Sequence, residues 1–170
     1  VVSASVILDL NKEIPKEIND SKKLTARLRL KMYAEIKKIS VVGIGIVNAQ
    51  EIDSLGIVMA TLLSMRKAFN NNSIKSQLAL VDGNIDPLLG VPTKLITKGD
   101  SCSLSIAAAS IIAKVTRDKI MSNLDIQYPG YGWSRNVAYG TKEHFLSIKN
   151  LGVSEEHRKS FRPIKDFISK

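Results

Sequence analysis

The sequence has one cysteine, Cys102, among its 170 residues, and this scarcity excludes several kinds of site. One cysteine cannot form an intramolecular disulfide, and no cluster of cysteine and histidine has the spacing of a zinc site. Chains without disulfides normally occupy a reducing compartment. The cysteine count therefore predicts a cytoplasmic location.

Long apolar runs and signal-like segments are also missing. No apolar run approaches the roughly 18 residues that span a bilayer, and the N-terminus lacks a basic region followed by a signal core. A Walker sequence and a Gly-x-Gly-x-x-Gly after a strand are absent too, which argues against a nucleotide-binding domain. We expect no membrane association and a monomeric chain.

Acidic residues are fewer than basic residues in this sequence. The chain has 25 Lys and Arg against 16 Asp and Glu, a net charge of +9. A field of that sign attracts polyanions, so nucleic acid is the expected partner, and the alternative is a basic surface that serves only solubility. With 44% hydrophobic residues, the chain has enough apolar surface to build the core of one domain.

The first half of the chain shows the periodicity of two strands and two helices. Residues 1–8 alternate as a strand does, and residues 41–47 form a second strand whose glycines suggest close backbone approach. Thr25 is placed to cap one helix, and Asn48 with Glu51 forms a capping box for another. The expected inner faces are Leu28, Met32, Ile36 and Ile39 in the first helix, and Ile52, Leu55, Met59 and Leu62 in the second.

The second half continues this alternation of strand and helix. Residues 78–81 and 93–97 are predicted to be short strands, and residues 103–123 a long helix rich in alanine. A break at residues 128–132 precedes a helix over residues 141–150, and a basic tail follows. Strands interleaved with helices indicate an α/β fold.

Two aspartates stand where predicted strands stop. Asp82 ends the strand at residues 78–81, and Asp100 follows the strand at residues 93–97. The ends of buried strands are where an α/β sheet exposes its reactive groups. Carboxylate oxygens suit Mg²⁺ or Mn²⁺, and two such ions activate water and stabilise the leaving oxygen in phosphodiester cleavage. The alternatives are a turn residue for Asp82 and a helix cap for Asp100.

Eight motifs follow one another along the chain. They are Asn-Asp-Ser-Lys-Lys-Leu (19–24), Glu-Ile-Asp-x-Leu (51–55), Val-Asp-Gly-Asn (81–84), Lys-Gly-Asp (98–100), Ala-Ala-Ser-Ile-Ile-Ala-Lys-Val-Thr-Arg-Asp (108–118), Tyr-Pro-Gly-Tyr-Gly (128–132), Tyr-Gly-Thr-Lys-Glu-His (139–144) and His-Arg-x-Ser-Phe (157–161). In this order they strongly resemble bacterial ribonuclease HII, the type 2 ribonuclease H, over essentially the whole chain.

The resemblance implies a ribonuclease H-like fold: a mixed five-stranded sheet flanked by helices. It implies a single domain over residues 1–170, with a helical and loop extension from about residue 128. It further implies a hydrolase of DNA replication and repair, an endonuclease that cuts the RNA-containing strand of RNA–DNA hybrids. Such an enzyme also nicks on the 5′ side of single ribonucleotides in duplex DNA, and it uses two divalent ions, Mg²⁺ or Mn²⁺.

The same resemblance suggests roles for individual residues. Asp82 and Asp100 correspond to two of the family's four metal-binding carboxylates. Lys22 corresponds to a contact with DNA phosphate. Tyr139 corresponds to the aromatic residue that packs on the sugar at the RNA–DNA junction, and such packing together with sensing of the 2′-hydroxyl distinguishes RNA from DNA.

The sequence departs from the family pattern most clearly at its beginning. The family's Asp-Glu-x-Gly-Arg-Gly strand, which carries the other two carboxylates and reads the 2′-hydroxyl, is absent before Val1. That strand is central to the family's sheet, and its loss leaves neighbouring N–H and C=O groups unpaired at about 1–3 kcal/mol each. We therefore expect a truncated sequence. The alternative is a basic domain that binds duplexes without cutting them.

Two smaller departures concern backbone conformation. Val137-Ala138 stands where the family usually has Lys-Gly before Tyr139, and alanine tolerates positive φ less well than glycine. Gly56 stands where asparagine is usual, inside the second helix. A glycine there should weaken the helix by roughly 1 kcal/mol relative to alanine.

Two sets of charged side chains admit a functional and a structural interpretation. Asp118 is either a spare metal ligand or a partner of neighbouring bases such as Lys114. Arg158 and Lys159, in the basic tail, either hold phosphates or are solvated charge.

The aromatic and histidine side chains are similarly open. His144 and His157 are possible general bases, although metal-bound water loses its proton without such help. Tyr131 and Trp133 either stack on nucleic acid or pack in a core.

Overall fold

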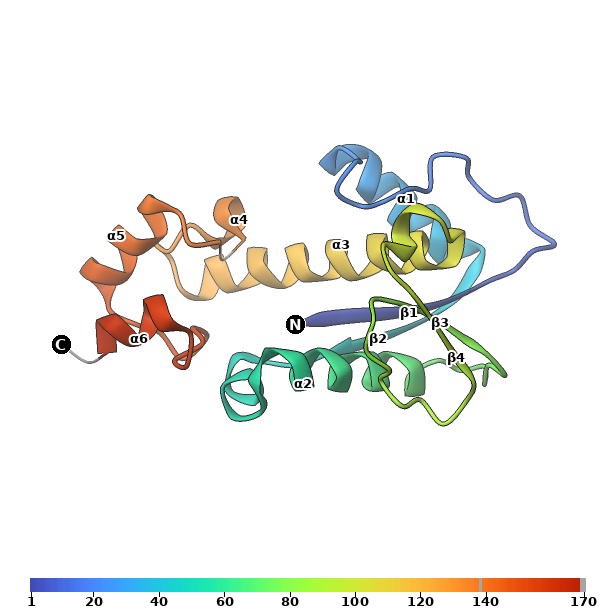
Figure 1. The fold of residues 1–170 in the computed structure, drawn as a ribbon. Coiled ribbons are helices and arrows are strands. Elements are labelled where there is room, and N and C mark those ends of the chain that lie inside the picture. The colour runs from blue at the N-terminus through green and yellow to red at the C-terminus, as the bar shows by residue number, and fades with distance from the viewer. Residues whose placement is uncertain (138, 169–170) are drawn as a thin grey trace. The chain divides into compact units, whose positions relative to one another are not determined.

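The computed structural model describes residues 1–137 and 139–168 (Figure 1). The chain divides into two compact units. Unit 1 contains Val1, Val47–Ala60 and the residues from Thr116 onward, and unit 2 contains Val2–Ile46 and Thr61–Val115. The long helices α2 (Ala49–Asn70) and α3 (Leu104–Gln127) contribute residues to both units. A single domain with an extension from residue 128 stays a prediction.

Unit 2 contains two small sheets. Strand β1 (Val2–Leu8) pairs antiparallel with β2 (Ser40–Ile46), and β3 (Ala79–Asp82) pairs parallel with β4 (Thr93–Ile96). The four strands agree with the sequence prediction to within one or two residues. They also give the mixed pairing expected for the fold, although the described residues form two two-stranded sheets and not one sheet of five.

Helix α1 (Ala26–Lys38) begins as its sequence predicts, because the Thr25 hydroxyl accepts a hydrogen bond from the Leu28 amide at 3.2 Å. Its apolar face packs in the core of unit 2, where Met32 and Ile36 are fully buried. The same core holds the first half of α3, including Ala108 and Ile111. Three alternate residues of β1 pack against it, Ala4, Val6 and Leu8.

The glycines of β2 permit the close approach that the sequence suggests. A Cβ atom on Gly45 would lie 1.9 Å from the carbonyl oxygen of Ser64, and one on Gly43 would lie 2.1 Å from that of Ala68. Both carbonyls belong to the second half of α2. Strand and helix therefore pack backbone to backbone, and no side chain fits between them.

The first half of α2 confirms one prediction and contradicts another. The Asn48 amide donates to Glu51 at 2.9 Å and the Glu51 amide donates to Asn48 at 2.8 Å, so the predicted capping box is present. The predicted inner face is wrong at Leu55 and Met59, which are exposed. Gly56 interrupts the helix here with a φ of 76° and a ψ of 158°, and every residue from 54 to 59 is exposed, so this segment has no inner face.

Unit 1 is helical beyond α3. It contains α4 (Trp133–Asn136), α5 (Lys142–Leu151) and α6 (Arg162–Ile168). Helix α5 agrees with its sequence prediction to within one residue at each end, the Thr141 hydroxyl caps it, and Gly152 closes it with a φ of 83°. Helices α4 and α6 are too short for their periodicity to be recognised in the sequence. No helix in the described part of the chain is long and apolar enough to cross a membrane.

Candidate functional site

The two predicted aspartates of unit 2 lie at neighbouring positions. Asp82 is the last residue of β3, and its carboxylate accepts a hydrogen bond from the Gly99 amide at 2.8 Å. Asp100 follows Gly99 in η1 (Gly99–Ser101), the single 3₁₀ turn after β4. The Asp82 carboxylate is thus bonded to Gly99, the residue that precedes Asp100. Asp82 is exposed and Asp100 half-buried, so both are open to solvent.

Gly99 is a part of this arrangement that sequence analysis did not identify. It is buried, and a Cβ atom on it would lie 2.5 Å from the Cδ1 atom of Ile106. The preceding Lys98 has a positive φ of 56°, which turns the chain sharply after β4. The glycine between lysine and aspartate was the available signal, because only glycine allows such close approach.

The structure gives each aspartate a definite local position. The Asp82 carboxylate binds the Gly99 amide, 17 residues away, so it links two segments of the chain. Asp100 lies in η1, and α3 begins only at Leu104, so Asp100 is not the residue that caps α3.

The carboxylates of Asp82 and Asp100, which we call the carboxylate edge of unit 2, provide oxygen atoms that suit a hard divalent cation. Within the described residues, no group of three or more His, Cys, Asp or Glu side chains is placed to share a metal. Mg²⁺ is commonly bound by one or two carboxylates and completes its octahedron with water and phosphate oxygens. The two aspartates fit that requirement.

Lys22 also belongs to unit 2, where it lies in a fixed turn. Its amide donates to the Asp20 carboxylate at 2.9 Å, and the carbonyl of the buried Ser21 accepts from the Arg29 guanidinium. These bonds fix the backbone of the turn. The side chains of Lys22 and Lys23 are exposed, as contacts with a phosphate backbone require.

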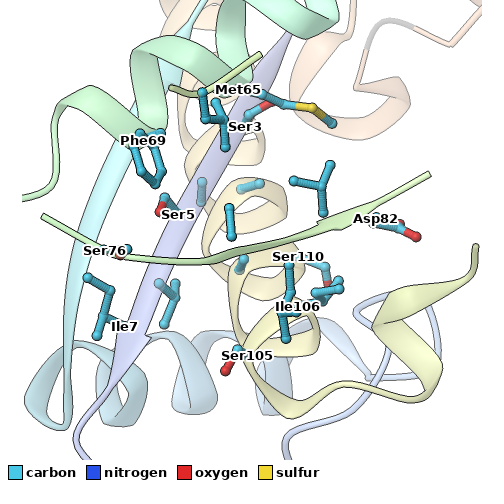
Figure 2. A pocket seen from close by; sticks show the side chains of 18 of the residues that line it. Ser3, Ser5, Ile7, Met65, Phe69, Ser76, Asp82, Ser105, Ile106 and Ser110 are labelled. Atoms are coloured by element: carbon cyan, nitrogen blue, oxygen red, sulfur yellow. The ribbon is translucent and has the colours of Figure 1, made fainter. Parts of the chain in front are cut away.

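A cavity of about 540 Å³ lies in unit 2 (Figure 2). Its lining includes every residue of β1, every residue of β3 with Asp82 among them, and Ser105, Ile106 and Ser110 of α3. Successive side chains of a strand point to opposite faces. A cavity lined by consecutive residues therefore meets the edges of β1 and β3, where their main-chain groups lie. We call this cavity the strand slot.

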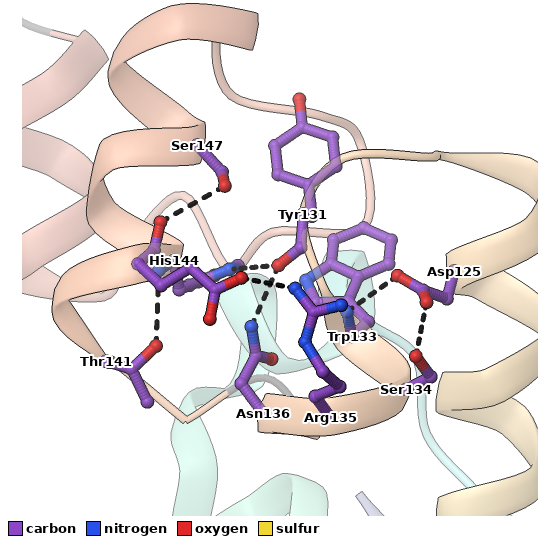
Figure 3. Close-up of polar contacts among 10 residues, drawn as sticks. Asp125, Tyr131, Trp133, Ser134, Arg135, Asn136, Thr141, His144 and Ser147 are labelled. Atoms are coloured by element: carbon purple, nitrogen blue, oxygen red, sulfur yellow. Dashed lines mark hydrogen bonds and ion pairs between the residues drawn. The ribbon is translucent and has the colours of Figure 1, made fainter.

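Four residues of unit 1 form a buried cluster, Tyr131, Trp133, His144 and His157, and Figure 3 shows the first three with their polar contacts. Trp133 and His144 are 1% and 3% exposed, and the rings of Tyr131 and Trp133 stack with centroids 5.0 Å apart. The Tyr131 carbonyl accepts from Asn136 at 2.8 Å and contacts His144 Nδ1 at 3.2 Å. This cluster is a core, so neither aromatic ring is available to stack on nucleic acid.

His157 completes the cluster. Its ring stacks on that of His144 with centroids 5.2 Å apart, and its Nδ1 atom accepts from the Ser154 amide at 3.1 Å. Burial, together with the neighbouring His144, lowers its pKa to about 4, although the Ser154 amide opposes the shift. Because His157 is 6% exposed and packs against the Tyr131 and Trp133 rings, a substrate cannot reach it, so the general-base interpretation of His157 is not supported.

Tyr139 lies in unit 1 and is 65% exposed, which leaves its ring accessible. The Arg117 guanidinium lies 5.9 Å from the ring centroid and donates to the Val137 carbonyl at 2.7 Å. Val137 has a positive φ of 43°, an unusual conformation for a β-branched residue. The sequence prediction concerned the neighbouring Ala138, which lies outside the described residues, so it stays a prediction.

The three secondary candidates also belong to unit 1. Asp118 is half-buried on α3, directly after Arg117. Arg158 is half-buried and its guanidinium lies 4.6 Å from the centroid of the Phe161 ring, whereas Lys159 is exposed. Asp53, to which sequence analysis gave no role, binds the same loop, although the motif Glu-Ile-Asp contained it.

Comparison with known sequences gives one consistent result. A family model described as ribonuclease HII matches residues 1–164. The ribonuclease HII of Wolbachia sp. subsp. Brugia malayi (strain TRS) is 49% identical over 164 residues, covering 96% of this chain and 81% of that protein. The ribonuclease HII of Shewanella amazonensis is 47% identical over 169 residues, covering 99% and 82%.

Solved structures share the fold. The ribonuclease H2 from Pyrococcus horikoshii OT3 has a TM-score of 0.77 at 20% identity, over 99% of this chain and 98% of that one. The ribonuclease HII from Archaeoglobus fulgidus, solved as a complex with PCNA, has a TM-score of 0.74 at 20% identity, over 99% and 89%. These values confirm the predicted fold. Because the family model and the similar sequences span nearly all of its length, the chain belongs to the ribonuclease HII family.

Proposed function

We propose that this ribonuclease H hydrolase is an endonuclease that cuts the RNA-containing strand of RNA–DNA hybrids. We further propose that it nicks on the 5′ side of single ribonucleotides in duplex DNA. The observation that carries the proposal is the bond from the Gly99 amide to Asp82, which holds that carboxylate at the residue before Asp100, while both aspartates are open to solvent. The net charge of +9 suits a polyanionic substrate.

Asp82 and Asp100 are the residues that would hold the divalent cations, Mg²⁺ or Mn²⁺. Such ions, when bound, lower the pKa of water and stabilise the oxygen that leaves during phosphodiester hydrolysis. The chain itself supplies the placement: β3 positions Asp82, η1 positions Asp100, and the Gly99 amide holds the two segments together.

The other predicted residues would bind the substrate. Lys22, exposed on its fixed turn, would contact a DNA phosphate. Tyr139 would pack its accessible ring against the sugar at the junction of RNA and DNA, where shape and the 2′-hydroxyl distinguish the two. Asp118 is the weakest candidate, because nothing in its surroundings indicates a bound metal.

The strand slot supports a role for one further strand. The free edges of β1 and β3 border it, so an inserted strand would bond to the main chain of both and join the two small sheets. Asp82 lines the slot, so carboxylates on that strand would come close to Asp82. An Asp-Glu-x-Gly-Arg-Gly segment would thereby supply the ligands that this sequence lacks.

A cleavage assay tests the proposal directly. The substrate is a DNA duplex containing one ribonucleotide, incubated with Mg²⁺ or Mn²⁺ and either the 170-residue chain or a chain extended at its N-terminus by the Asp-Glu-x-Gly-Arg-Gly strand. We expect cutting by the extended chain on the 5′ side of the ribonucleotide, and duplex binding by both. Binding by both chains without any cutting would favour the alternative, a domain that only holds duplexes.

Single substitutions in the extended chain test the carboxylates. Asp82→Asn and Asp100→Asn should each reduce cutting by more than about 100-fold, because loss of a ligand costs at least as much as loss of a residue that supports one. Duplex binding measured in the absence of metal should change little. Substantial residual cutting by either variant would contradict the assignment.

A monomeric state and a cytoplasmic location stay predictions.

A further inference from the structure

The loop at residues 155–161 of unit 1 is held by side chains from the first turns of α2. The Asp53 carboxylate accepts three hydrogen bonds from it: from the Lys159 amide at 2.7 Å, the Ser160 amide at 2.9 Å and the Ser160 hydroxyl at 2.6 Å. Gln50 donates to the Glu155 carbonyl at 2.9 Å. Helix and loop are more than 100 positions apart in the sequence, so these bonds fix tertiary structure.

The Asp53 carboxylate is charged where it makes these contacts. Burial by itself raises its pKa, but the hydrogen bonds from Ser160 and Lys159 and the charge of Arg158 outweigh burial and lower the pKa below its ordinary value of 3.8. Hydrogen bonds to an ionised acceptor are stronger than those to a neutral one. Asp53 is therefore a firm anchor for the loop at neutral pH.

The anchored loop presents two cations. Lys159 is exposed, and the Arg158 guanidinium lies 4.6 Å from the centroid of the Phe161 ring. The preceding His157 is 6% exposed and packs in the aromatic cluster, which fixes the loop from its other end. A guanidinium held in place matches the geometry of phosphate oxygens and loses less entropy on binding than a free one.

We propose that Asp53 is a positioning residue which, through the main chain of residues 159 and 160, holds Arg158 and Lys159 ready to bind phosphates of the duplex. The inference rests on the proposed function, because it takes that enzyme's duplex as the ligand. A different view gives Asp53 the opposite effect: an acidic side chain beside a polyanion should simply repel it. When Asp53 is neutralised, the first view predicts weaker binding of the duplex and the second predicts tighter binding.

The decisive variant is Asp53→Asn in the full chain, with binding to a fluorescent DNA duplex containing one ribonucleotide measured by anisotropy at several salt concentrations. Positioning predicts a Kd raised about five- to tenfold, as for the loss of one charge-assisted contact. It also predicts a salt slope that is smaller by about one, although no cation is removed. Tighter binding or an unchanged Kd would overturn the proposal.

Matched variants separate position from charge. Glu156→Gln removes one negative charge from the same loop and should leave binding unchanged or slightly tighter. Ser160→Ala removes one of the three bonds without altering charge and should weaken binding less than Asp53→Asn does. In an Arg158→Ala/Lys159→Ala background, Asp53→Asn should no longer weaken binding. Continued weakening in that background would show that Asp53 acts through other residues.

Amide hydrogen exchange provides a readout that needs no nucleic acid. The Lys159 and Ser160 amides should exchange about tenfold faster or more in Asp53→Asn than in the wild type, because the anchor of the loop is lost. A wild-type chain that protects these amides but fails to bind the duplex would refute the proposed function. Normal binding by a variant with unprotected amides would refute the positioning role alone.

Discussion

The carboxylate edge of unit 2 and the aromatic–histidine cluster of unit 1 use polar side chains in opposite ways. Asp82 and Asp100 are open to solvent, and a single main-chain amide ties them together. His144 and His157 are buried against rings and bonded to the main chain. Histidine is the usual proton carrier near neutral pH, yet here the histidines build a core and the exposed aspartates are the candidates for chemistry.

This contrast shows that residue type is a weaker guide to function than position. Both regions are rich in side chains that titrate, and both lie in recognisable motifs. Their difference comes from what surrounds them. A carboxylate at a strand end can reach a cation and a substrate, whereas a ring enclosed by Tyr131 and Trp133 reaches neither.

The largest effect on stability should come from removing the centre of the cluster. Trp133→Ala should lower the free energy of unfolding of unit 1 by about 3–5 kcal/mol, because Trp133 is 1% exposed and its loss leaves a cavity. Urea unfolding followed by circular dichroism measures the change. Trp133→Phe keeps an aromatic ring and should cost less.

The matching change at the carboxylate edge should have little effect on stability. Asp82→Asn retains an acceptor for the Gly99 amide, so its free energy of unfolding should stay within about 0.5 kcal/mol of the wild type. If Trp133→Ala cost less than Asp82→Asn, the division into a structural cluster and a chemical edge would be wrong.

The next effect is a dependence of stability on pH that arises from His157. Its pKa in the folded chain is about 4, against 6.5 when unperturbed, so the unfolded chain binds more protons between these values. The contribution of neutral His157 to the free energy of unfolding is therefore complete above pH 6.5, and it is lost as the pH falls toward 4. The loss should approach about 3 kcal/mol, the equivalent of the full shift.

Urea unfolding at pH 7.5 and pH 4.5 measures this loss, and His157→Gln provides the control. The variant should be less stable at pH 7.5 but should lose less stability on acidification. Asp53 and Asp125 have lowered pKa values, so their contributions are complete above pH 3.8 and do not enter this window. An equal loss in wild type and variant would show that His157 is not the group that titrates.

Local interactions are what the sequence predicted well. The Thr25 cap and the capping box of Asn48 and Glu51 were recognisable because each needs only residues within one turn. The glycines Gly43 and Gly45 indicated close packing correctly, since a missing side chain inside a strand needs a reason.

Tertiary contacts account for what the sequence did not predict. Leu55 and Met59 lie in an exposed segment that Gly56 interrupts, and helix propensity gives only the cost of that glycine, not its geometry. At the candidate site, the ends of the predicted strands indicated the positions of Asp82 and Asp100. The Gly99 amide that links them depends on the path of the chain after β4, and no periodicity encodes that path.

The smallest predicted effect concerns Lys22 and tests whether its turn in unit 2 makes a specific phosphate contact. Lys22→Ala should weaken duplex binding by the 170-residue chain about two- to fivefold and reduce the salt slope by about one, because one fewer phosphate is neutralised. Its free energy of unfolding should not change, since the side chain is exposed on a turn that main-chain bonds hold.

Lys16→Ala is the matched control, because it removes an equal charge from another exposed position of unit 2. A long-range field acts on both lysines alike, whereas a direct contact releases a counterion only where the phosphate lies. A lower slope for Lys22→Ala alone would therefore place the backbone of the duplex at the turn that carries Lys22. Equal slopes for the two variants would mean that unit 2 attracts the duplex by net charge, and that Lys22 makes no specific contact with a phosphate.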